Sequence, residues 1–289
     1  MGVRLSDYQK GLLFTSLGVL TLTPDALLVR LIHTDAWSLL FWRGLLMTLG
    51  FSLFLWWKGL SPARLGGRGW LAALFLAIST TCFVFSLEST HAANTLVIIA
   101  TSPLLAAIFS RFFLKESVPL VTWAAIALAL VGVFWSLHDG LGRGNLKGEL
   151  FAAVSAVCMA SHFTTLRWWK SSYGPVSIWG AGVLTVLASI PLASPLSIPR
   201  EDVGWTALLG LVVLPTAFGL MAVGPRYLPA PEVGLLLLGE TVLGPIWVWL
   251  VLGETPGSST LTGGALVILT LSLHGAYRKL RSPGLPPDR

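Results

Sequence analysis

The sequence predicts an all-α integral membrane protein with ten transmembrane helices, arranged as a 5+5 repeat of inverted topology. Three observations support this fold class: an apolar composition, ten apolar segments of membrane-spanning length, and a shared residue order in the two halves. Of the 289 residues, 54% are hydrophobic and 11% are charged, and the mean hydropathy is +0.78. Soluble domains carry about 25% charged residues, so this composition excludes a single water-soluble core.

Apolar segments follow one another along the whole chain. A helix needs about 20 mostly apolar residues to cross about 30 Å of hydrocarbon. Segments of this kind lie at residues 11–32, 36–57, 69–88, 92–114, 119–138, 148–169, 176–194, 203–224, 231–252 and 260–279. The connections between them are short, so no soluble domain is expected to be inserted.

The lysine and arginine residues favour one orientation of these helices. If the first helix starts in the cytoplasm, 14 of the 19 basic residues fall on the cytoplasmic side, four fall on the opposite side and Arg43 lies within a span. Cytoplasmic loops carry such an excess. We therefore expect both termini in the cytoplasm and the protein in a bacterial inner (plasma) membrane. Because the basic residues form short clusters between spans, no nucleic-acid partner is expected.

Similar residues recur at a nearly constant spacing and indicate an internal repeat. With offsets of 135 to 138 residues, they are Lys10 and Lys147, Arg30 and Arg167, Trp42 and Trp179, Gly69 and Gly204, and LKES (114–117) and LGET (252–255). We expect a first repeat at 1–138, a linker at 139–147 and a second repeat at 148–289. Five helices are an odd number, so the second repeat enters the membrane from the opposite side. In secondary transporters such inverted halves open a central site to each side in turn.

Residues 91–137 and 227–273 resemble the paired halves of EamA-like transporters of the drug/metabolite transporter superfamily. The resemblance rests on small residues opening the fourth helix, a proline at Pro103, a glutamate in the following turn (LKES) and a glycine-bearing fifth helix. Arg43 matches an arginine typical of the second helix. The second half departs from the pattern, with Thr241 in place of the proline and Pro245 one turn later. The resemblance implies a ten-helix 5+5 fold and export of small metabolites such as amino acids, or of drugs.

Glu240 is the acidic residue of an otherwise apolar run, LLLLGETVLGPIWVWL at 235–250. It lies about 14 Å along its helix, near the middle of the bilayer. An acidic residue at this depth costs a few kcal/mol, so something must offset that cost. One interpretation is a carboxyl that packs helices together by hydrogen bonding. The other is a cavity group that binds substrate or a proton where the halves meet, with Ser102 as its equivalent in the first repeat.

Asp25 and Arg43 are expected to form an ion pair. Both lie about seven residues from the outer ends of neighbouring antiparallel helices, which places them at equal depth, about 10 Å into the membrane. Pairing lowers the cost of both charges. The pair is interpreted either as structural or as an outer gate.

Further polar residues at membrane depth are candidates for the same site. His162 corresponds to Asp25 in the second repeat and is either a proton relay or a structural hydrogen-bonding group. Asn94 follows the outer turn between the third and fourth helices and is expected to face a cavity. Glu116 and Glu254 occupy equivalent turns, where hydrogen bonding to helix ends explains them.

Four prolines are expected to interrupt helices one, four, eight and nine: Pro24, Pro103, Pro215 and Pro245. A proline within a span leaves a carbonyl without its partner and permits bending, which is tolerated where protein or cavity water satisfies that carbonyl. The sequence therefore predicts that these helices line the cavity and take part in gating.

The predicted function is alternating-access transport of a small amphipathic or zwitterionic solute, with protons as a possible coupling ion and with export as the implied direction. Uptake of a vitamin- or nucleoside-like solute is the alternative. An intramembrane enzyme would need convergent catalytic groups, and we find no HExxH motif, paired aspartates or Ser/His pair at one depth. Cys82 and Cys158 lack a CxxC spacing, so no metal or cofactor is expected.

Overall fold

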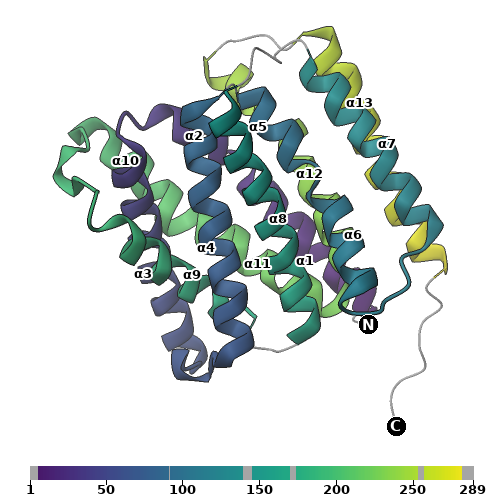
Figure 1. Cartoon of the computed structure of the whole chain (residues 1–289), viewed down its shortest axis with the longest axis horizontal. Coiled ribbons are helices and arrows are strands. Elements are labelled where there is room, and N and C mark those ends of the chain that lie inside the picture. The colour runs from purple at the N-terminus through teal and green to yellow at the C-terminus, as the bar shows by residue number, and fades with distance from the viewer. Residues whose placement is uncertain (1–5, 91, 139–144, 170–173, 253–256, 282–289) are drawn as a thin grey trace, which may run out of the picture.

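The computed structural model describes residues 6–90, 92–138, 145–169, 174–252 and 257–281, and these residues form a bundle of helices (Figure 1). The first half contains α1 (Asp7–Leu22), α2 (Asp25–Leu31), α3 (Ala36–Lys58), η1 (Pro62–Arg64), α4 (Gly66–Ser89), α5 (Ala92–Ile99), α6 (Ser102–Phe112) and α7 (Leu120–Leu137). The second half contains α8 (Leu146–Trp169), α9 (Val176–Ser189), η3 (Pro195–Ser197), η4 (Arg200–Asp202), α10 (Val203–Ala207), η5 (Leu208–Val213), α11 (Leu214–Tyr227), α12 (Ala230–Leu252) and α13 (Ser258–Arg281).

Most of the helices have the length that a membrane requires. Within the described ranges, seven continuous or broken helical segments are long and apolar enough to cross a bilayer, and two apolar helices, at Leu120–Ser136 and Val176–Ser189, are shorter. The 24-residue α13 corresponds to the tenth expected segment and is not among these seven. The all-α membrane fold is therefore confirmed. The seventh helix ends at Ser189, five residues earlier than predicted, in the region where prolines crowd the sequence.

The second helices of the two halves, α3 and α9, lie side by side and run antiparallel, and so do the fifth helices, α7 and α13. In the α7–α13 pair, Thr122 lies against His274, and Trp135 near the other end lies against Thr262. The α3–α9 pair has the same arrangement, with Trp179 bonded to Ser52. Equivalent helices that run in opposite directions mean that the two halves are inverted relative to each other.

The contacts between the two halves are also symmetric: where a helix of the first half packs against a helix of the second, their equivalents in the opposite halves pack against each other. Helix α4 packs against α8, and their equivalents in the other half, α11 and α1, pack against each other. Residues 139–144 of the expected linker lie outside the described residues, and α8 begins at Leu146. The bundle is thus built around a pseudo-two-fold axis, with the α7–α13 pair at one edge (Figure 1).

The structure breaks two of the four helices in which a break was expected and widens a third without interrupting it. The first helix ends at Leu22 and restarts after Pro24, and the fourth is interrupted at residues 100–101, just before Pro103. In the eighth helix, Leu214 N–H donates to Leu209 O, five residues back, so a π-helical segment precedes Pro215. A wider turn of this kind adapts the helix to the donor that Pro215 lacks.

The expected break at Pro245 is absent, because α12 runs without interruption from Ala230 to Leu252. A proline inside a helix removes one backbone hydrogen bond and crowds one carbonyl. Within a membrane protein, neighbouring groups can compensate for that loss while the helix continues. The predicted break in the ninth helix was therefore wrong, whereas the breaks predicted next to prolines in the first and fourth helices are present.

Small residues allow the antiparallel pairs to approach closely. A Cβ atom placed on Gly263 of α13 would lie 2.5 Å from the carbonyl oxygen of Gly132 and 2.5 Å from the amide nitrogen of Ser136, both on α7. Helix interfaces in membranes use glycine in this way because backbone contact replaces the hydrophobic driving force.

Replacing Gly263 with alanine should destabilise the protein, because the added methyl group meets backbone atoms that cannot move aside. We expect a loss of about 1–3 kcal/mol, the usual cost of overpacking, in detergent-induced unfolding of the purified protein. Gly275→Ala on the same helix is the matched control, since nothing lies within 4 Å of a Cβ there. An equal loss of unfolding free energy in the two variants would contradict the close approach of α7 and α13.

Candidate functional site

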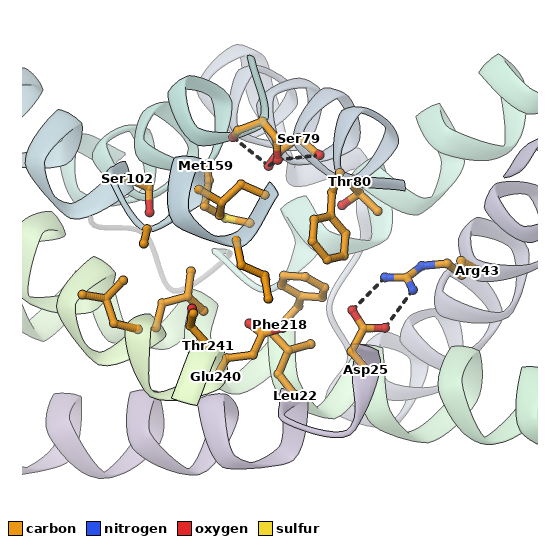
Figure 2. A pocket seen from close by; sticks show the side chains of 17 residues that line it. Leu22, Asp25, Arg43, Ser79, Thr80, Ser102, Met159, Phe218, Glu240 and Thr241 are labelled. Atoms are coloured by element: carbon orange, nitrogen blue, oxygen red, sulfur yellow. Dashed lines mark hydrogen bonds and ion pairs between the residues drawn. The ribbon is translucent and has the colours of Figure 1, made fainter. Parts of the chain in front are cut away.

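A central cavity lies where the two halves meet (Figure 2). Its lining comes from the first four membrane-spanning segments of the first half and from α8, α11 and α12 of the second. Most of these side chains are apolar, and the polar ones include Asp25, Arg43, Ser102 and Glu240. The cavity therefore combines a largely apolar wall with a few polar groups, as small-molecule sites do.

The cavity is compact in this conformation. Its volume of about 60 Å³ has room for only a few water molecules. Pockets that hold a drug-sized ligand usually measure roughly 300–1,000 Å³. A metabolite can therefore occupy this position only when the surrounding helices move apart.

Asp25 and Arg43 form the ion pair predicted from their depth. Arg43 Nη1 donates to Asp25 Oδ1 at 2.7 Å, and Nη2 donates to Oδ2 at 3.1 Å. The two side chains are 5% and 3% exposed, respectively. Two parallel bonds fix the relative orientation of the groups, so the pair holds the start of α2 against α3, about two turns from the beginning of that helix.

Glu240 lies in the interior of α12 and lines the same cavity, beside Phe218 and Leu22 (Figure 2). Within the described part of the chain its carboxyl group makes no hydrogen bond and no ion pair, whereas both oxygens of Asp25 are bound to Arg43. Among the described residues that line the cavity, Arg43 is the one basic side chain. Glu240 is therefore the carboxyl group that remains available to another partner.

Threonine hydroxyls satisfy carbonyl groups at the two helix breaks. Thr23 Oγ1 donates to Leu20 O at 2.8 Å, and Thr101 Oγ1 donates to Ile98 O at 2.6 Å. Trp247 of α12 in turn donates through Nε1 to Thr23 Oγ1 at 2.8 Å. These bonds lower the cost of irregular backbone at membrane depth. The sequence analysis did not predict these bonds, although a threonine lies one or two residues before each of the two prolines and indicates such a bond.

A reciprocal serine contact also lines the cavity. Ser79 Oγ donates to Ser155 O at 3.0 Å, and Ser155 Oγ donates to Ser79 O at 2.9 Å. These bonds tie α4 to α8 across the boundary between the halves (Figure 2). Nothing in the sequence singled out these two serines, because their pairing depends on how the helices face each other.

Two of the candidate residues lie outside the lining of this cavity. His162 is 1% exposed, and its Nδ1 donates to Ala72 O at 2.8 Å, which is the arrangement of a structural histidine. Asn94 is buried and donates through Nδ2 to Glu149 Oε1 at 3.1 Å, joining α5 to the start of α8. The structure thus brings Glu240, Asp25, Arg43 and Ser102 together and places His162 and Asn94 elsewhere.

Inverted helical halves with a cavity at their interface are the architecture of secondary membrane transporters. The sequence pattern of the EamA-like transporter family matches residues 9–137 and 146–274, which is most of the chain in two copies. The chain belongs to this family of transporters.

Individual relatives are distant. An uncharacterized transporter of Bacillus subtilis, YdfC, is 25% identical over 60% of this chain, a match that covers 58% of that relative and so less than two thirds of its length. The pseudopaline exporter CntI of Pseudomonas aeruginosa is 23% identical over 80% of this chain and 83% of its own. A solved crystal structure is similar with a TM-score of 0.81 at 18% identity, covering 94% of this chain and 99% of the other. That structural likeness concerns the fold alone.

Removing either member of the Asp25–Arg43 pair should destabilise the protein. Breaking a buried pair leaves one charge without compensation, which typically costs about 3–5 kcal/mol. We expect Asp25→Asn and Arg43→Gln each to lower the free energy of unfolding by this order, and Asp25→Arg combined with Arg43→Asp to recover part of what each reversal loses alone.

The exposed Lys10–Asp7 pair of α1 is the control, and its reversal should change stability little. If the swapped double variant were no more stable than either single reversal, the two charges would not act as a pair.

Proposed function

We propose that this protein is a secondary-active carrier that moves small zwitterionic or amphipathic metabolites, such as amino acids, across the membrane by alternating access, in the direction of export. Membership of a transporter family supports the class, and the cavity supports the kind of cargo. A polyanionic cargo would call for several basic groups, whereas Arg43 is the one basic side chain among the described lining residues and is bound to Asp25.

One observation carries the proposal: the carboxyl group of Glu240 has no described partner in a cavity with room for only a few water molecules. A carboxylate with so little water and no counter-charge is costly at this depth. A proton, or the ammonium group of a cargo molecule, removes that cost. The compact state has no room for a metabolite, so it is favoured only when Glu240 holds a proton. Cargo takes the place of the proton once the helices have moved apart, and this competition couples the exchange of cargo to the exchange of a proton.

Direction and orientation are part of the proposal. The excess of basic residues at one end of the bundle supports an orientation with both termini in the cytoplasm, and the inner membrane of a bacterium is the proposed location. The pseudopaline exporter among the relatives favours export. We propose no catalytic reaction for this chain.

A second candidate cargo is a flat aromatic solute of the vitamin or nucleoside type. Phe83 and Phe218 both line the cavity, and aromatic rings favour stacked or edge-on contact with other rings. This cargo would use the same cavity and the same movement, with Glu240 accepting a hydrogen bond from a ring or ribose group.

Counterflow in proteoliposomes tests the proposed function. With labelled leucine outside and unlabelled leucine inside, we expect saturable uptake that responds to an imposed pH gradient. Glu240→Gln should lower the rate by at least about tenfold, because a charge-assisted contact is worth about 1.5–3 kcal/mol, and should abolish the response to the gradient.

The matched control is Glu201→Gln, which removes an exposed carboxyl group from η4 outside the cavity and should leave counterflow unchanged. Counterflow in Glu240→Gln with an intact pH response would contradict the role of Glu240. Flux that never saturates would identify a pore instead of a carrier.

A further inference from the structure

A second hollow lies at the end of the bundle that carries the basic excess. It measures about 440 Å³ and lies between the turn joining α6 to α7, the end of α8, the start of α12 and the end of α13. We call it the vestibule. Its polar lining consists of Glu116, Ser117, Thr122, Arg167, Glu232 and Arg278. Its volume lies in the range of small-molecule pockets, whereas that of the central cavity does not.

The vestibule contains two ion pairs, each between a glutamate carboxylate and an arginine guanidinium group. Arg167 Nε donates to Glu116 Oε1 at 3.0 Å, and Arg278 Nη2 lies 2.8 Å from Glu232 Oε1. The Glu116–Arg167 pair joins the first half of the protein to the second. The sequence interpretation of Glu116 as a group bonded to its own helix end is therefore incomplete, since its partner lies on α8.

Hydrogen-bonding groups remain unused in these pairs. Among the described residues, Arg278 Nε and Glu116 Oε2 are buried and have no hydrogen-bond partner, and Glu232 Oε1 has none beyond its ion-pair contact with Arg278. The first is a cationic donor and the second an anionic acceptor. An unsatisfied buried polar group costs about 1–3 kcal/mol, so a ligand that supplied the missing partners would be stabilised.

We propose that the vestibule is a recruitment site for zwitterionic solutes, in which the carboxylate of the solute accepts from Arg278 and its ammonium group donates to Glu116. The assignment rests on the proposed function, because it gives the solute its first binding position before the central cavity. A solute that binds Glu116 competes with Arg167 for the same carboxyl group. Its arrival therefore weakens the tie between the halves at the end where it enters.

Equilibrium dialysis of the purified full-length protein tests this site with labelled leucine as the probe. The Glu240→Gln variant is used, so that the remaining binding reports the vestibule. We expect leucine to bind at least about tenfold more tightly than its methyl ester, which lacks the carboxylate, or N-acetylleucine, which lacks the ammonium group, because each loses a charge-assisted contact. Equal binding of the three compounds would overturn the proposal.

Variants of the lining locate the site. Arg278→Gln and Glu116→Gln should each weaken leucine binding by about tenfold or more. Ser117→Trp should block binding by filling space without removing a charge, since Ser117 is an exposed residue of the lining. Ser61→Trp, at an exposed position outside the vestibule, is its control and should bind as before. Binding that survives Ser117→Trp and both charge variants would overturn the proposal even if one variant folded poorly.

Comparison with counterflow separates this proposal from the proposed function. Wild-type counterflow of leucine without any binding to the Glu240→Gln variant would overturn the vestibule site and leave the carrier function standing. Binding to that variant without wild-type counterflow would support the vestibule site and contradict the carrier function. If neither is observed, both proposals fail.

Discussion

The Asp25–Arg43 ion pair is the interaction on which the central cavity depends. It holds the first helix immediately after its break at Pro24 and fixes that segment to α3. It also occupies both oxygens of Asp25 and the two terminal nitrogens of Arg43, whose Nε has no hydrogen-bond partner among the described residues. Because those charges satisfy each other, Glu240 is left as the carboxyl group without a described partner, and the proposed chemistry of the cavity follows from this difference.

The two halves share a topology but contribute different parts to the site. The first half supplies the broken helices, α1–α2 and α5–α6, where Leu20 O and Ile98 O accept hydrogen bonds from threonine hydroxyls. The second half supplies Glu240 on α12, which is unbroken. Between them, the serines of α4 and α8 bond across the boundary. A site built from both halves changes its exposure whenever one half moves relative to the other, and this is the physical basis of alternating access.

The sequence predicted those features that depend on position along a helix. The span boundaries and the Asp25–Arg43 pair follow from the rise per residue, which is nearly constant in a helix. Features that depend on the direction in which a side chain faces were harder to predict from the sequence. Depth alone suggested His162 for the site, but the face of α8 on which it lies directs it to Ala72.

The packing of whole helices explains the remaining differences between the predicted and the observed structure. Pro245 was expected to break α12, yet a proline removes one hydrogen bond and leaves the outcome to its surroundings. The contact between Ser79 and Ser155 and the vestibule pairs of Arg167 and Arg278 join segments that are far apart in the chain. No local pattern specifies such partners, because they are set by the packing of whole helices.

Access to the cavity from the two faces of the membrane tests the central claim most directly. Thr241 lines the cavity, and a Thr241→Cys variant in a background with Cys82→Ala and Cys158→Ala places one reactive thiol there. The account predicts that a membrane-impermeant maleimide labels this thiol in both right-side-out and inside-out vesicles, while the vesicles stay tight to the reagent. Labelling confined to one face, with or without a solute gradient, would contradict it.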